Sequence, residues 1–439
     1  MRFLNAFLNG QLVGRISEGN DLWTFEYDTA WAAGPDSFDL APGLPRQGSV
    51  EGQPGLIRDG GSLRPVQWYF DNLLPEGALR EVVIKEAGLK GDDAFALLAW
   101  LGAESAGSLV LLPPGAQAPT EGELQALADE ALSGRIRNMA RVSLSSGAPK
   151  RMSVAGAQPK LLVVYRNGQL FEPVGAEPST HILKPNHPGE DYPSSVINEY
   201  LVLKLAGKVG LAPPAVYRRY VPEPVYIIER FDRMQDARGR TQRLHIIDAC
   251  QLLNKSRNFK NTSASLKTLA QCIELCRNRA AARLGIYRWL MFNVLVGNDD
   301  NHLKNISFRV SAEGVELSPP YDMLCTAAYH TTAMAGDRAI WPALDLMVAL
   351  PGAAKFGEVT RDSFIKAGAE LGIPEQVCLR ELSSMRARLP DALKNLEDEI
   401  AADNAQLLEG AKPYLAGERR LIRVIESIVL PFMLERSAM

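Results

Sequence analysis

The sequence predicts an α+β protein in which a strand-rich lobe precedes a helical lobe, with a small α/β subdomain in front of both. Short apolar runs separated by turn residues dominate the first half of the chain, and longer runs with helical periodicity dominate the second half. A Pro-rich segment at 113–119 separates the subdomain from the rest. With 439 residues, the chain is also too long for a single hydrophobic core.

The small α/β subdomain is expected over residues 1–112. It opens with alternating residues that end in Asn9-Gly10, a dipeptide typical of a two-residue hairpin turn, and a further strand is expected around 23–27. A short helix is predicted at 121–132. The basic, serine-containing stretch 134–151 is interpreted as a flexible approach to the next domain, with a basic surface as the alternative. Residues 113–150 are therefore predicted to form a linker with a short helix.

The strand-rich lobe is expected over residues 151–231. Its predicted elements are a strand at 161–165, a turn at Asn167-Gly168, a strand at 181–184, a helix capped by Ser194 or Ser195, and strands at 216–217 and 225–228. The remainder, 232–439, is predicted to be mostly helical, with helices at 266–277, 280–296, 362–371 and 422–435.

The composition argues against several other classes of protein. A net charge of −3 gives no global basic field for nucleic acid, so any DNA contact is expected to be local or made through a partner. The five cysteines lack close-paired metal spacing and are expected to be buried free thiols in a reducing cytoplasm. The alternating first ten residues do not resemble a signal peptide, and the most apolar run, 289–296, is far too short to span a membrane.

Two short runs carry the chemistry, Asp300-Asn301-His302-Leu303-Lys304-Asn305 and Tyr321-Asp322. An Asp and an Asn five positions apart, with a second Asp about 17 residues later, is the spacing with which a kinase places a base and two magnesium ligands. Asp300 is predicted to orient the acceptor hydroxyl, and Asn305 and Asp322 are predicted to hold Mg²⁺. The alternative is a pair of capped turns, because Asn and Asp are common at helix ends.

The strand-rich lobe offers groups for the phosphates. Small side chains in the loop Val154-Ala155-Gly156-Ala157-Gln158-Pro159-Lys160 would let backbone N–H groups approach phosphate oxygens, although an ordinary turn would have the same composition. Lys184 lies in an apolar strand and would need a partner, for which Glu199 on the following helix is the candidate. The alternative for Lys184 is a side chain that emerges at the strand end before Pro185.

Other residues of the predicted site are less specific. The tripeptide Glu229-Arg230-Phe231 follows an apolar strand where a hinge between lobes would lie, so its backbone would present a carbonyl and an amide to an adenine edge. His302 and Lys304 alternate within the catalytic stretch and would either reach the phosphates or remain solvated loop residues. A strand-rich lobe, a short hinge and a helical lobe together make a two-lobed, protein-kinase-like arrangement.

These residues resemble one known family, the HipA-type toxin kinases, which are serine/threonine kinases of bacterial type II toxin–antitoxin modules. The matching motifs run in order over about residues 1–330: Phe70-Asp71-Asn72-Leu73-Leu74-Pro75, Gly102 with Ser105-Ala106-Gly107, Ser153-Val154-Ala155-Gly156-Ala157-Gln158-Pro159-Lys160, Thr180-His181-Ile182-Leu183-Lys184, Asn198-Glu199-Tyr200, Glu229-Arg230-Phe231-Asp232-Arg233, Asp300 to Asn305, and Pro320-Tyr321-Asp322. The sequence departs from the family pattern at 244–251, where Ile246 and Ile247 replace the commoner polar Gln-Glu.

The resemblance implies a role for each matched position. It implies that Asp300 is the proton acceptor, that Asn305 and Asp322 bind Mg²⁺, and that Lys184 and the loop from Ala155 to Lys160 bind the phosphates of ATP. It further implies that Glu229 to Phe231 bind adenine and that His302, Leu303, Lys304 and Tyr321 line the pocket. Ser153 resembles the serine that the family autophosphorylates, where about two added negative charges cannot share the space of the ATP phosphates.

The resemblance also implies partners. The segment 71–75 belongs to the subdomain that in such toxins packs on the kinase core and helps contact a HipB-like helix-turn-helix antitoxin, so that DNA is bound mainly indirectly. The implied acceptor is a protein, such as an aminoacyl-tRNA synthetase of the glutamyl type, whose phosphorylation would inhibit translation. Two alternatives remain open: a co-repressor with a catalytically weak pocket, and a small-molecule or lipid kinase of the same fold.

Overall fold

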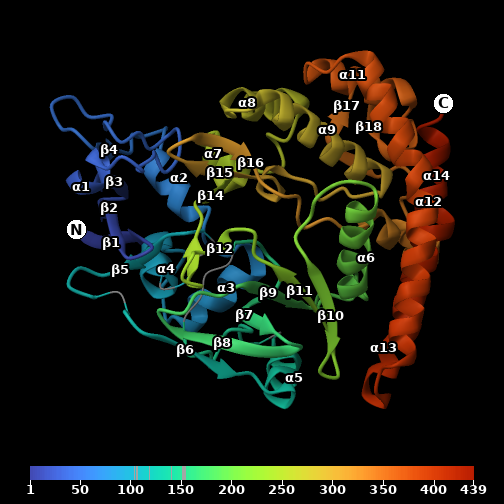
Figure 1. Ribbon diagram of the computed structural model, residues 1–439, viewed down its shortest axis with the longest axis horizontal. Coiled ribbons are helices and arrows are strands. Elements are labelled where there is room, and N and C mark those ends of the chain that lie inside the picture. Colours follow the sequence, from blue (N-terminus) through green and yellow to red (C-terminus); the bar gives the residue numbers. More distant parts are fainter. Residues whose placement is uncertain (103, 105–106, 118, 140, 151–154) are drawn as a thin grey trace. The chain divides into compact units, whose positions relative to one another are not determined.

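The computed structural model describes residues 1–439 except 103, 105–106, 118, 140 and 151–154 (Figure 1). The described chain divides into two compact units. Unit 1 comprises Met1–Lys184, Glu229–Lys260 and Ser307–Ser318, and unit 2 comprises Pro185–Ile228, Asn261–Ile306 and Pro319–Met439. The content is α+β, as predicted, whereas the predicted division into 1–112, 113–150, 151–231 and 232–439 stays a prediction.

Unit 1 begins with a five-stranded antiparallel sheet in the order β4-β3-β2-β1-β5. Its strands are β1 (Arg2–Leu8), β2 (Gln11–Gly19), β3 (Leu22–Tyr27), β4 (Leu56–Arg58) and β5 (Val110–Leu112), and the helices of this part are α1 (Thr29–Ala33), α2 (Pro65–Asp71), α3 (Gly77–Glu86) and α4 (Ala94–Leu101). The predicted hairpin is confirmed, because Asn9 and Gly10 both have positive φ, as a two-residue turn requires. Aromatic side chains pack between sheet and helices: Trp23 lies edge-on against Phe95, and Phe25 lies tilted against Phe70.

A second sheet in unit 1 runs in the order β9-β7-β8-β6. The strands are β6 (Gly122–Ala126), β7 (Leu161–Arg166), β8 (Gln169–Gly175) and β9 (His181–Pro185). The predicted strands at 161–165 and 181–184 and the turn at Asn167-Gly168 are confirmed. The predicted helix at 121–132 is wrong: its first half is β6, which pairs with β8, and a helix, α5, covers Asp129–Asn138. Cross-strand pairing, which no local pattern reveals, decides the state of this segment.

Small strands complete unit 1. They are β12 (Arg233–Gln235) paired with β13 (Thr241–Arg243), and the sheet β14-β15-β16 formed by Ile246–Asp248, Ser307–Ser311 and Gly314–Leu317, with α7 (Ala249–Leu252) next in the chain after β14. The prediction of a mostly helical chain after residue 232 is therefore wrong for these segments. Ile246 and Ile247, where the sequence departs from the family pattern, lie on β14, and Asp248 begins α7 with a capping box to Gln251.

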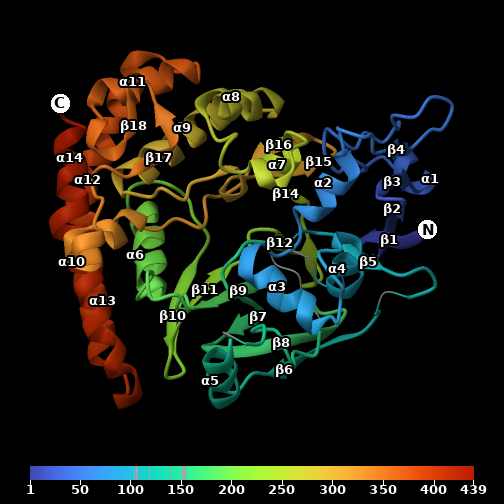
Figure 2. The same ribbon diagram turned by 180° about the vertical axis from the view of Figure 1, so that it is seen from behind.

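Unit 2 is mainly helical (Figures 1 and 2). Its elements are α6 (Ser195–Lys208), β10 (Val216–Tyr220), β11 (Pro224–Glu229, whose last residue belongs to unit 1), α8 (Leu266–Leu275), α9 (Arg279–Leu295), α10 (Thr332–Ala335), β17 (Asp345–Leu350), β18 (Ala353–Lys355), α11 (Arg361–Glu370), α12 (Glu375–Ala405), α13 (Lys412–Val424), a π-helical turn at Ile425–Val429, and α14 (Leu430–Arg436). The predicted helices at 266–277, 280–296 and 362–371 are confirmed, and 422–435 begins inside α13.

The longest helix, α12, is absent from the sequence-based predictions. It carries Pro390 in its interior, and a proline ordinarily ends a helix because it has no backbone N–H. Leucines such as Leu382, Leu389 and Leu396 nevertheless form a buried face along α12, which packs against α6 in both views (Figures 1 and 2). Tertiary packing of an apolar face therefore outweighs the local cost of the proline.

All five cysteines are buried free thiols, as predicted. In the part of the chain that the structure describes, no helix combines the length and the apolar character needed to cross a lipid bilayer.

Candidate active site

The predicted catalytic loop follows α9 in unit 2. Gly297, at φ +71°, ends this helix, and a Cβ atom at this position would lie 2.7 Å from Val429 Cγ1 and 2.8 Å from Ala327 Cβ. The carbonyl of Gly297 accepts from the amide of Ala327 at 2.8 Å and from the Thr326 hydroxyl at 3.1 Å, and the same hydroxyl accepts from the amide of Asp299 at 2.7 Å. The start of the loop is therefore fixed by close packing and by Thr326.

Asp300 and Asn305 are held together within this loop. The Asn305 side-chain Nδ2 donates to the carbonyl of Asp300 at 2.7 Å, and the amide of Asn305 donates to the carbonyl of His302 at 2.9 Å. The Asp300 side chain is 55% exposed, while His302 Nε2 lies 3.9 Å from Asp300 Oδ1. The loop thus presents the Asp300 carboxylate outward, as a group that must meet a substrate requires.

The other residues of the stretch are buried. Leu303, His302 and Lys304 are buried, so the alternative that the last two are solvated is wrong. The Tyr321 hydroxyl donates to the Lys304 carbonyl at 2.8 Å, which brings the second motif of the sequence next to the first. Residues far apart in the chain, 300–305 and 321–322, therefore form one constellation.

Asp322 has a left-handed backbone at φ +54°. This region is uncommon for residues other than glycine, and such strain is found where a surrounding structure holds a functional side chain. Three residues later, α6 fixes the main chain at Cys325: Asn198 Nδ2 donates to the Cys325 carbonyl at 3.0 Å, and the Cys325 amide donates to Asn198 Oδ1 at 2.7 Å. The prediction did not assign a role to Asn198, and only its place beside Glu199 in the motif points to it.

The charges of Glu199 and Asp322 both act on one buried group, the Tyr226 hydroxyl. Burial raises the pKa of Tyr226 well above its ordinary value, and the charges of Glu199 and Asp322 raise this pKa further. Glu199 itself is buried on α6, next to Asn198. Within unit 2, the structure therefore gathers Glu199, Asp300, His302 to Asn305, Tyr321 and Asp322. Ser194 precedes α6 without a side-chain cap, and the Ser195 hydroxyl accepts from the His187 amide.

In unit 1, the loop that is predicted to bind phosphate leads directly into β7. Gly156 has φ +106°, a conformation that favours glycine, and Lys160 Nζ donates to the Ala155 carbonyl at 2.7 Å across the loop. Ala157 is exposed, and Gln158 and Pro159 are half-buried. The predicted residues Ser153 and Val154 lie outside the described residues.

Lys184 lies on the strand next to this loop. Leu161 of β7 pairs with Leu183 of β9, so one further step of the antiparallel register sets Lys160 opposite Lys184. Lys184 is buried within β9, and not at an exposed strand end, so the alternative for this residue is wrong. Two lysines that each adjoin the Leu161–Leu183 pair suit a polyanion. The predicted pair of Lys184 with Glu199 joins residues of different units and stays a prediction.

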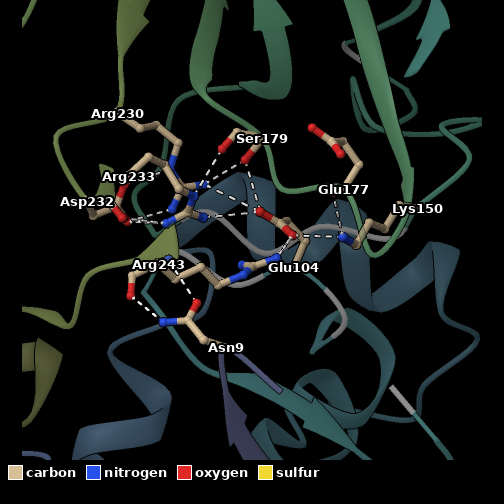
Figure 3. Close-up of polar contacts among 9 residues, drawn as sticks. All are labelled: Asn9, Glu104, Lys150, Glu177, Ser179, Arg230, Asp232, Arg233 and Arg243. Carbon is tan, nitrogen blue, oxygen red and sulfur yellow. Dashed lines mark hydrogen bonds and ion pairs between the residues drawn. The ribbon is translucent and has the colours of Figure 1, made fainter. Parts of the chain in front are cut away.

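Arg230 of the predicted hinge belongs to a buried polar network (Figure 3). Its guanidinium donates to both carboxylate oxygens of Asp232, at 2.9 and 2.7 Å, and to the Ser179 hydroxyl at 3.0 Å, while its amide donates to the Thr180 carbonyl at 2.9 Å. The Arg230 side chain and amide therefore already have protein partners. Any adenine contact by Glu229 to Phe231 is expected from other main-chain groups of the tripeptide.

Glu104 is the centre of this network, and sequence reasoning missed it. Its carboxylate is 0% exposed and meets Lys150 at 2.9 Å, Arg233 at 3.2 Å and Arg243 at a shorter distance (Figure 3). Burial alone would raise the pKa of Glu104, but Arg243, Lys150, Arg233 and Arg230 together bring this pKa well below its usual range. For the cation Arg233, burial instead lowers the pKa, to about 10. No spacing rule links a glutamate at 104 to cations at 150–243.

The donor set suits Mg²⁺ brought in with a polyphosphate. Among the described residues, no group of three or more His, Cys, Asp and Glu side chains forms a self-contained metal cluster. Because Asn305 uses Nδ2 within the loop, its Oδ1 is the atom available to a hard cation, and Asp322 supplies a carboxylate. One amide oxygen and one carboxylate are the few protein ligands that Mg²⁺ takes when phosphates and water complete its shell.

Comparisons with known proteins identify the family of the chain. The family model described as the HipA-like C-terminal domain matches residues 152–393, and the model of the HipA N-terminal domain matches residues 4–112. The chain belongs to the HipA family. As a HipA-family member, it is 31% identical over 441 residues to the Sinorhizobium fredii protein Y4mE, provisionally designated a kinase, covering 97% of this chain and 99% of the relative.

A second relative and a solved structure extend the likeness to the whole HipA chain. The serine/threonine-protein kinase toxin HipA of Shewanella oneidensis is 29% identical over 455 residues, covering 94% of this chain and 96% of that one. The structure of the Shewanella oneidensis HipA, HipB and operator DNA complex matches with a TM-score of 0.76 and 26% identity, covering 98% of both chains. The predicted family and fold are confirmed.

Proposed function

We propose that this HipA-family chain is an ATP- and Mg²⁺-dependent serine/threonine protein kinase that acts as the toxin of a toxin–antitoxin module. The observation that carries the proposal is the constellation of Asp300, Asn305 and Asp322 in unit 2, in which an exposed carboxylate is accompanied by the amide oxygen of the buried Asn305 and the carboxylate of the half-buried Asp322. Phosphoryl transfer demands mainly positioning and charge stabilisation, which such a constellation supplies.

Asp300 is proposed to orient the acceptor hydroxyl and receive its proton. Its carbonyl is fixed by Asn305 and its amide donates to Asn298 Oδ1 at 3.1 Å, so the main chain is held while the side chain stays accessible. His302, whose ring lies 3.9 Å from Asp300, and Lys304 are proposed to line the pocket with Leu303 and Tyr321. A fixed main chain with an accessible side chain suits Asp300, because this residue must contact a macromolecular acceptor without moving its neighbours.

Asn305 Oδ1 and the Asp322 carboxylate are proposed to hold Mg²⁺, and Mg²⁺-ATP supplies the transferable phosphoryl group when bound. Lys184 and the loop from Ala155 to Lys160 are proposed to bind the phosphates, with Glu199 holding Lys184. Glu229 to Phe231 are proposed to contact adenine. The left-handed backbone of Asp322 supports its role, because such a conformation for a residue other than glycine is found mainly where a functional side chain is needed.

The proposed biological context follows the relatives. The Shewanella oneidensis structure is a complex with HipB and operator DNA, so a HipB-like antitoxin is proposed as partner, with DNA contacted mainly through it. The proposed acceptor is a protein, a glutamyl-type aminoacyl-tRNA synthetase, and autophosphorylation of Ser153 is proposed to switch the kinase off. We place this activity in the cytoplasm, where ATP and such acceptors occur.

The test uses the purified full-length chain with ATP labelled at the γ-phosphate. Asp300→Asn should reduce transfer by about two orders of magnitude or more, because general-base and orienting effects contribute on this scale, and should relieve growth inhibition. Asp299→Asn is the matched control, a neighbouring carboxylate outside the proposed chemistry, and should retain transfer. Equal transfer by Asp300→Asn and the unchanged chain would refute the assignment, and mass spectrometry of Ser153 shows whether the chain modifies itself.

A further inference from the structure

The segment Asp71 to Glu76 contacts the loop that is proposed to bind phosphate. An isolated parallel β-bridge joins Pro75 and Gly156, and the amide of Glu76 donates to the Gly156 carbonyl at 3.1 Å. Both segments belong to unit 1 and both are described. A segment that the family resemblance connects with the antitoxin therefore lies directly against the phosphate side of the site.

Because the peptide group is planar, the hydrogen bond from Glu76 to the Gly156 carbonyl also fixes the orientation of the next N–H in the loop. In a trans peptide, the C=O of one residue and the N–H of the next point in opposite directions. Because Glu76 holds the Gly156 carbonyl, the N–H of Ala157 must point away from Glu76. The orientation of the Ala157 amide is thus set by Glu76, which lies 81 positions earlier in the chain.

The same rule applies one step further back, at Arg80. Its Nη1 donates to the Pro75 carbonyl at 3.3 Å, so the N–H of Glu76 is directed the opposite way, toward Gly156. Arg80 is only 4% exposed and is itself held by two carboxylates, Asp71 at 2.9 Å and Asp92 at 2.6 Å. The planar fork of arginine can make these three contacts together, which a lysine ammonium does less well.

Two further contacts fix the segment on its other side. Glu76 Oε2 meets Lys260 Nζ at 2.7 Å, and Arg257 Nε meets Asp71 Oδ2 at 2.7 Å. The Asn72 side chain donates to the carbonyl of Lys255 at 3.0 Å. Residues 71–80 and 255–260 therefore hold one another. The Glu76 amide connects them to the loop through its hydrogen bond to Gly156.

We infer that Arg80 and the segment from Asp71 to Glu76 are positioning residues for phosphate binding, because they aim the backbone of the Gly156 loop. The inference rests on the proposed function, in which this loop binds the phosphates of ATP. Supporting groups of this kind keep a binding loop in its productive geometry before the ligand arrives, which lowers the cost of binding.

The test compares binding of Mg²⁺-ATP with binding of adenosine, which lacks phosphates, by calorimetry on the full chain. Arg80→Ala should weaken ATP binding by about tenfold, the effect of one hydrogen bond to a charged group, and leave adenosine affinity within about twofold. The KM for ATP should rise while kcat at saturating ATP changes much less. Arg80→Lys should fall between, because it keeps the charge without the fork.

Arg135→Ala is the matched control, since Arg135 also forms a two-point ion pair in unit 1, with Glu172, but away from the loop. It should leave both affinities unchanged. If Arg80→Ala does not fold, Asp92→Ala decides, because the Asp92 side chain is largely exposed and its loss should still lower ATP affinity selectively. Equal loss of ATP and adenosine binding, or no loss of either, overturns the inference while leaving the kinase proposal intact. Failure of the unchanged chain to bind ATP would overturn both.

Discussion

Replacing Glu104 with glutamine probes the buried network of unit 1 directly. The carboxylate is completely buried and meets Lys150, Arg233 and Arg243, and Ser179 donates a hydrogen bond of 3.0 Å to it. The network of described residues contains four cations, Lys150, Arg230, Arg233 and Arg243, and two carboxylates, Glu104 and Asp232. Neutralising Glu104 leaves Asp232 to balance all four buried cations of this network.

The expected cost follows from the burial. Removing one member of a buried ion pair costs about 3–5 kcal/mol, because the remaining charges stay desolvated without a partner. For a compact unit of this size, this amounts to a fall in the melting temperature of unit 1 by roughly 10 °C. The pKa of Glu104 is depressed in the folded state, so its contribution is complete above the unfolded pKa and is lost only as pH falls through the folded pKa. The effect of the substitution should therefore be constant between about pH 5 and 8.

Thermal unfolding gives the melting temperature, and hydrogen exchange of residues 229–245 shows whether the loss is local to the network. Glu172→Gln is the control, because this buried carboxylate meets one cation, Arg135, among the described residues, and its loss should cost less. Adding Lys150→Met to Glu104→Gln should restore part of the stability, since one uncompensated cation is removed. An unchanged melting temperature and unchanged exchange in Glu104→Gln would refute the reasoning.

Two further predictions concern unit 2. Burial and the neighbouring Glu426 raise the pKa of Glu397 to about 7, so stability should be lost as pH rises from the unfolded pKa to about 7. Glu397→Gln should therefore raise the melting temperature more at pH 8 than at pH 5. An equal change at both pH values would contradict this. Gly297→Ala should cost about 2–4 kcal/mol through overpacking and a positive φ, because its Cβ would lie under 3.0 Å from Val429 and Ala327. Its measurement is thermal unfolding together with phosphotransfer, and an unchanged protein would show that the loop relaxes freely.

Local signals in the sequence predicted much of the fold. Asn9-Gly10 and Asn167-Gly168 specify their turns because Asn and Gly tolerate the positive φ that both turns have. The helices α8, α9 and α11 follow from apolar periodicity. Signals that depend on distant partners could not be found in this way. Segment 122–126 becomes a strand because it pairs with β8, and Pro390 is tolerated in α12 because a long apolar face is buried.

The same contrast holds for the site. Asp300 and Asn305 lie five residues apart, so their spacing could be interpreted directly, and the structure joins them by a hydrogen bond. Asn198, Thr326 and Glu104 act on main-chain groups or charges far away in the sequence. Their roles depend on tertiary contacts that residue type and spacing do not encode.

The most direct measurement for the central claim is a crystal structure of the full chain with Mg²⁺ and a non-hydrolysable ATP analogue. The account predicts that Asn305 Oδ1 and an Asp322 carboxylate oxygen lie about 2.0–2.1 Å from the metal ion, with Lys184 and the Gly156 loop on the phosphates and the Asp300 carboxylate facing the γ-phosphate. A nucleotide bound elsewhere, or a metal ion held without Asn305 and Asp322, would contradict it.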